Sequence, residues 1–115
     1  MTRVTVEAGI CGFTTTVVAT KTARRRVSVV VESDCEAVAD MDGDLQDVGW
    51  MEALGPPGES AVWECACAHL THPCCPVPIG IMKAIEVELD LALPKDVVIH
   101  FQDEQGEERE VSPPG

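Results

Sequence analysis

Aromatic residues and cations are both scarce in this chain of 115 residues. It has two tryptophans, two phenylalanines and no tyrosine, so its core must be built from valine, isoleucine and leucine. Only 8 lysines and arginines stand against 20 aspartates and glutamates, which gives a formal net charge of −12. Because nucleic acids and anionic lipids both attract cations, this charge argues against binding to either of them.

Long apolar runs and the features of a signal peptide are missing too. No stretch approaches the roughly 20 apolar residues that span a bilayer. The first residues lack the cationic region and apolar run of a secretory signal. We therefore expect a soluble cytoplasmic protein that does not bind membranes. In a reducing cytoplasm its six cysteines are more consistent with free thiols or ligands than with disulfides.

The common catalytic and nucleotide-binding motifs are absent as well. The sequence contains no GxGxxG, P-loop, HExxH or GxSxG pattern and no internal repeat. Dinucleotide binding and a serine triad therefore lose their usual sequence support. Whether the protein is an enzyme stays open.

The N-terminal third of the chain has the pattern of β-structure. Valines alternate with polar residues from Val4, threonine and valine dominate the next segment, and an almost wholly apolar run follows. These patterns predict strands at 4–7, 13–20 and 27–31, and a last strand is predicted at 97–101. The apolar content of 45% suits one domain, which we assign to residues 1–102. The acidic tail, residues 103–115, is predicted to be disordered.

Three helices are predicted in the middle of the chain. Ser33 and Glu36 have the spacing of a capping box, and Pro78 suits a first helical position. Apolar residues at helical spacing then give helices at 33–48, 60–69 and 78–92. The predicted fold class is α+β, with two layers. A three-strand antiparallel meander and the C-terminal strand form a small mixed sheet, and two to three helices cover one of its faces.

Chain direction predicts that distant cysteines meet. Cys11 lies in a glycine-flanked turn, Cys35 opens the first helix, and Cys75 precedes the last helix. Counting strands and helices along the chain brings all three to the same end of the sheet. Thiolates that converge in this way are typical ligands of an iron–sulfur cluster or of zinc. A fourth ligand to the metal is expected from Cys74, Cys67, His72 or solvent.

Other readings of the cysteines stay open. The CxxCxxC spacing of ferredoxins is missing, so Cys35 could instead act as a redox thiol resolved by Cys11 or Cys75. The glycine loop and helix N-termini could hold an anion or a protein partner, and the cysteines could simply be buried. Cys65 and Cys67 point to different helix faces, so at least one of them is expected to serve packing. The protein partner is unknown, and an unpaired edge strand would favour a homodimer.

Four short segments carry a resemblance to a known family. AGICGF at 8–13, SDC at 33–35, CPVP at 75–78 and LALPKDV at 91–97 resemble an uncharacterised family of short cysteine-containing proteins from anaerobic prokaryotes. The resemblance extends from Val4 to Phe101 and implies no established activity. Cys11, Cys35 and Cys75 match its pattern, and Cys65 and Cys67 match it less clearly, so the resemblance implies a core of three cysteines.

Overall fold

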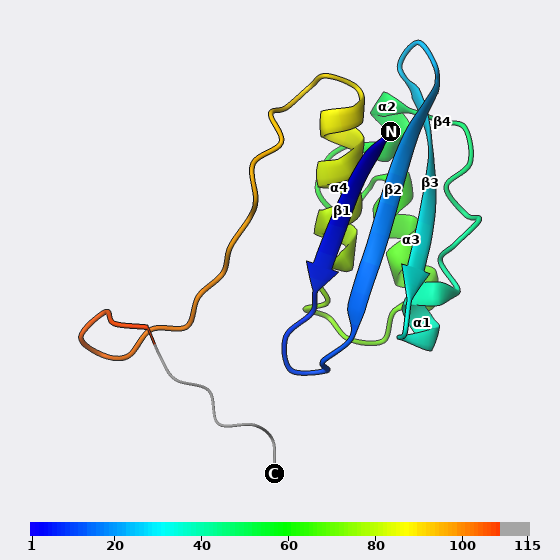
Figure 1. The fold of residues 1–115 in the computed structure, drawn as a ribbon. Helices are drawn as coiled ribbons and strands as arrows, with labels where there is room; N and C mark the ends of the chain where they lie inside the picture. Colours follow the sequence, from blue (N-terminus) through cyan, green and yellow to red (C-terminus); the bar gives the residue numbers. More distant parts are fainter. Residues whose placement is uncertain (109–115) are drawn as a thin grey trace.

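A computed structural model describes residues 1–108 (Figure 1). Its sheet is built on an antiparallel meander in which Val4 pairs with Val17, and Val17 with Val31. The strands are β1 (Thr2–Glu7), β2 (Thr14–Ala23) and β3 (Arg26–Ser33). These are the three N-terminal strands that the sequence predicts. A two-residue strand, β4 (Val48–Gly49), adds to the free edge of β3, which gives the order β1-β2-β3-β4.

The helices lie on one face of this sheet (Figure 1). They are α1 (Glu36–Ala39), α2 (Trp50–Ala53), α3 (Ala61–His69) and α4 (Val77–Glu88). The two long ones, α3 and α4, confirm the helices predicted at 60–69 and from Pro78. The α+β class with helices packed on one face of the sheet is therefore confirmed. None of the helices in residues 1–108 is long and apolar enough to cross a membrane.

The core between sheet and helices is aliphatic, as the shortage of aromatic residues predicts. Val17, Val29, Met41 and Ile81 are among its fully buried side chains. Gly80 lets α4 approach β1 closely, because a Cβ atom there would lie 2.4 Å from a methyl carbon of Val6. The helix is thereby held against the face of the sheet at β1.

The first predicted helix, at 33–48, is wrong over most of its length. Only residues 36–39 are helical, and the following residues form a series of turns. Gly43 has φ 93° and Asp47 has φ 48°, neither of which an α-helix admits. Ser33 does not cap the helix, because its hydroxyl accepts a hydrogen bond from the Cys35 amide. Cys35 itself occupies the N-cap position.

The predicted C-terminal strand, 97–101, is wrong as well, and the sheet is antiparallel rather than mixed. After α4, Asp90 takes φ 59° and the Leu91 amide donates to the Glu86 carbonyl, which is a Schellman ending. The chain then leaves the body as an extended segment (Figure 1). Asp103 closes a turn at 103–107 by accepting bonds from the amides of Gln105 and Glu107. The rest of the predicted tail, 109–115, lies outside the described residues.

Candidate metal centre

Helix α3 places Cys65 and His69 one turn apart on the same side. The helix begins at a defined point, because the hydroxyl of Ser60 accepts a hydrogen bond from the Trp63 amide. Its buried stripe runs through Val62, Cys65 and Ala66. Residues four apart on a helix are neighbours on its surface. The Cys65 thiol therefore lies in the core, and the His69 ring lies where the same stripe reaches solvent.

The third member of the group comes from the loop between α1 and β4. Asp44 follows Gly43, whose positive φ turns the chain back toward α3. The loop is fixed to β3 on both sides of Asp44. The Val31 amide donates to the Asp42 carboxylate at 3.0 Å, and the Val29 amide donates to the Leu45 carbonyl at 2.8 Å. The position of the Asp44 backbone is thus set by strand β3.

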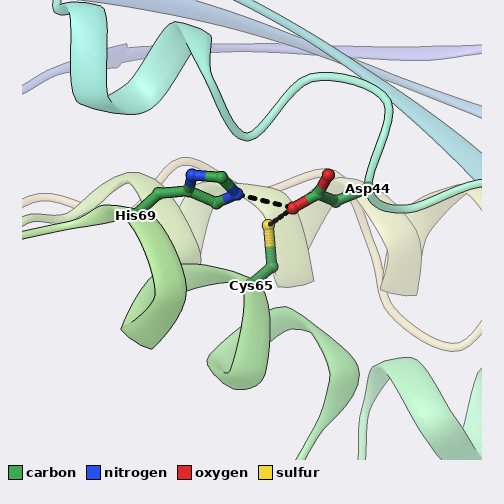
Figure 2. A group of neighbouring side chains, drawn as sticks. All are labelled: Asp44, Cys65 and His69. Atoms are coloured by element: carbon green, nitrogen blue, oxygen red, sulfur yellow. Dashed lines mark hydrogen bonds and ion pairs between the residues drawn. The ribbon is translucent and has the colours of Figure 1, made fainter.

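Figure 2 shows the three side chains pointing toward one another. Asp44 Oδ2 lies 2.6 Å from His69 Nε2 and 3.6 Å from Cys65 Sγ. Within residues 1–108, this is the one group of three or more His, Cys, Asp and Glu residues with ligand atoms all within 4.8 Å. We call Asp44, Cys65 and His69 the metal-ligand triad.

The members of the triad differ in their contact with water. Cys65 is only 6% exposed, whereas the side chains of His69 and Asp44 are 26% and 43% exposed. Burial, and then the nearby Asp44 carboxylate, raise the pKa of the Cys65 thiol from its ordinary 9.0 to about 12. Without a cation between them, the thiol therefore stays protonated next to the carboxylate.

The spacing of the donor atoms suits a small tetrahedral ion. In a tetrahedral zinc site the sulfur and oxygen ligands lie roughly 3.5 Å apart, and nitrogen and oxygen ligands roughly 3.3 Å apart. The sulfur–oxygen distance of 3.6 Å already matches. The nitrogen–oxygen distance of 2.6 Å is that of a hydrogen bond, and it has to open by less than about 1 Å to admit the ion. The half-exposed Asp44 side chain can make this adjustment.

The cysteines and histidine singled out from the sequence lie elsewhere. Figure 1 shows the β1–β2 loop, α1 and the α3–α4 connection at the same end of the sheet. We call these segments, residues 8–13, 34–36 and 70–76, the thiol rim. Cys11, Cys74 and His72 are exposed there, and Cys35 and Cys75 are half-buried. Shared metal binding by Cys11, Cys35 and Cys75 stays a prediction.

Three residues of the predicted ligand set share one surface feature. Cys67, His72 and Cys75 line a shallow hollow of about 200 Å³, together with Trp63 and Leu70. The hollow lies where α3 ends and the proline-rich segment leads into α4. It brings two thiols and an imidazole to one place on the surface.

Sequence reasoning missed the metal-ligand triad, although one signal was available. Cys65 and His69 have the i, i+4 spacing that puts two ligands on one helix face. In the sequence, Cys65 was compared with Cys67, two residues along, and not with His69, which shares its helix face. Asp44 carried no signal, because it was expected within a long helix that the structure replaces by turns.

The wider comparisons identify the family of the chain but not its chemistry. No curated protein and no solved structure shows significant similarity to it. The model of a family of unknown function, DUF6951, matches residues 2–101, which is most of the chain. The chain therefore belongs to the DUF6951 family.

Proposed function

We propose that the protein binds one zinc ion through Asp44, Cys65 and His69. The observation that carries this proposal is the convergence of a thiol, an imidazole and a carboxylate within 4.8 Å of one another. The three come from two segments, α3 and the loop at 40–47, that are each fixed by their own hydrogen bonds. The donors are therefore positioned before any metal arrives.

The donor set favours zinc over magnesium and calcium. A thiolate and an imidazole bind zinc well, whereas magnesium and calcium prefer a shell made of oxygen atoms. Three protein ligands leave the fourth position of a tetrahedral ion free. Because Asp44 and His69 are partly exposed, this position opens toward solvent and can take water or a donor atom from another molecule. The ion would act as a Lewis acid there, and it would also join α3 to the loop.

Zinc titration of the reduced protein tests the proposal. We expect one equivalent to bind, measured by competition with a chromophoric chelator. Cys65→Ser should weaken binding at least about 100-fold, because a hydroxyl does not replace a thiolate ligand. Cys67→Ser is the matched control, because Cys67 is exposed on the same helix two residues along.

Cobalt supplies an independent readout of the ligands. Cobalt-loaded protein should show a thiolate-to-metal charge-transfer band that Cys65→Ser removes and Cys67→Ser keeps. If both variants bind zinc as the parent chain does, the triad is a hydrogen-bonded cluster and the proposal fails. A folded Cys65→Ser chain, verified by circular dichroism, is required for either conclusion.

The thiol rim is a second candidate, as a centre for an iron–sulfur cluster or for thiol redox chemistry. It is favoured by the position of its three segments at one end of the sheet and by the hollow that Cys67, His72 and Cys75 line (Figure 1). Anaerobic reconstitution with iron and sulfide tests it. A visible chromophore that is lost in Cys35→Ser and Cys75→Ser but kept in Cys65→Ser would support the rim. A colourless protein whose thiols do not pair on mild oxidation would exclude both activities.

A further inference from the structure

Residues 91–101 form an arm that leaves the body of the protein with its apolar side chains in solvent (Figure 1). Leu93 is 78% exposed, Ile99 82% and Phe101 72%, values that a monomer rarely tolerates in one segment. The other exposed large apolar side chains of the arm are Leu91, Val97 and Val98. The run at 97–101 has the β-branched and aromatic composition of a strand.

The backbone at residues 96–101 does not pair with the sheet. No backbone hydrogen bond joins residues 96–101 to any other part of residues 1–108. The family match nevertheless extends to residue 101, so the arm belongs to the domain that the family shares. An extended, strand-forming segment of this kind can add as a strand to an exposed sheet edge.

The same chain also has an exposed sheet edge to which such a strand can add. Strand β1 pairs only with β2, so one edge of the sheet is open along Thr2–Glu7. The arm departs beside the start of that strand, because Glu88 at the end of α4 accepts a hydrogen bond from the Thr2 hydroxyl at 2.8 Å. Figure 1 shows the arm on the side of the sheet where β1 forms the edge. An open edge and a free strand are thus exposed on the same side.

We propose that two copies of the chain exchange arms, each arm adding a strand to the open β1 edge of the other copy. A second copy is favoured over the arm's own sheet because the chain turns away from its own body after the Schellman ending of α4 (Figure 1). Reciprocal exchange satisfies both unpaired elements at once and closes with two-fold symmetry.

Charge and size are consistent with this exchange. The excess of negative charge does not lie on the two surfaces that would pair. Strand β1 carries one cation and one anion, Arg3 and Glu7, and the arm likewise carries Lys95 and Asp96. The two surfaces therefore meet without net repulsion. The six large apolar side chains of each arm represent on the order of 1,000 Å² of surface in the two copies together. This is near the lower bound of a stable interface.

The molar mass of the full chain in solution tests the exchange, with a chelator present so that no metal can bridge two copies. We expect light scattering to give twice the chain mass of 12.3 kDa at high protein concentration. Raising the salt concentration should strengthen the dimer, because it screens the repulsion between two acidic bodies. The double variant Ile99→Glu/Phe101→Glu should be monomeric. Val30→Glu, at an exposed apolar position on β3, is the matched control and should stay dimeric.

Amide hydrogen exchange shows which segments form the interface, which the molar mass alone does not reveal. Residues 97–101 and β1 should be protected at high concentration, and both should lose protection on dilution. A monomer at every concentration overturns the proposal, whether its arm is protected, which would mean pairing with its own sheet, or unprotected. A dimer that survives Ile99→Glu/Phe101→Glu overturns it as well.

Discussion

The metal-ligand triad and the thiol rim contain similar residues in very different settings. In the triad, each side chain belongs to a segment that is fixed by the core or by hydrogen bonds, and the donor atoms touch. In the rim, three segments that carry cysteines lie at one end of the sheet (Figure 1), but Cys11 and Cys74 are exposed. Proximity of segments is therefore not the same as proximity of ligand atoms.

The difference lies in how each group is assembled. An i, i+4 pair on a helix needs only the helix to exist, since the period then places both side chains on one face. A rim made of three loops needs every loop to choose a conformation that turns its side chain inward. A preformed metal site is thus more easily built on α3 than on the rim.

The largest expected effect is on zinc-dependent stability. Zinc at about 1,000 times its dissociation constant should raise the free energy of unfolding by roughly 4 kcal/mol. The triple variant Cys11→Ser/Cys35→Ser/Cys75→Ser should keep this increase, and Cys65→Ser should lose it. Urea unfolding with zinc and with a chelator measures the difference. If the triple variant loses this increase in stability, the zinc site lies at the thiol rim and not at the metal-ligand triad.

The pH dependence of zinc affinity is the next largest effect. The pKa of Cys65 is raised to about 12, so below that pH the thiol must release its proton when zinc binds. Affinity should therefore rise about tenfold per pH unit between about pH 7.5 and 9. Chelator competition at several pH values, corrected for the chelator's own protonation, measures this slope. A flat profile would mean that Cys65 is not a ligand.

The metal-free protein should lose stability at alkaline pH. The raised pKa of Cys65 means that between pH 9.0 and about 12 the unfolded chain releases a proton that the folded chain keeps. The free energy of unfolding should fall there with rising pH, by at most about 1.4 kcal/mol per unit. Cys65→Val removes the thiol and should flatten the fall relative to the parent chain. Equal slopes in the two proteins would contradict the assigned burial.

Local patterns predicted the regular parts of the fold well. Alternation and β-branched residues located β1, β2 and β3, and Ser60 and Pro78 located the starts of the two long helices. These features depend on neighbours in the sequence, so the chain alone is enough to see them. The α+β class followed from their order.

The errors arose where tertiary contacts override local preference. The apolar spacing at 37–48 suited a helix, but Met41 and Leu45 enter the core from turns that Asp42 ties to β3. The strand-like run at 97–101 pairs with no strand of residues 1–108, because the chain leaves the body after the Schellman ending of α4. Asp44 entered no predicted site because its position depends on those turns. Predicting the triad therefore required the conformation of the loop at 40–47, which neither helical nor strand periodicity in the sequence indicates.

The smallest expected effect separates a metal ligand from a stabilising contact. His69 and Asp44 form a partly exposed pair in the metal-free protein, and such pairs contribute less than about 1 kcal/mol to stability. His69→Gln should therefore leave metal-free unfolding by urea almost unchanged while weakening zinc binding at least about tenfold, because the ring nitrogen is a ligand. A large loss of metal-free stability with unaltered zinc binding would make His69 a structural residue. Since Cys65 lies deeper in the core, the His69 variant distinguishes these two roles with less disturbance of packing than a Cys65 variant.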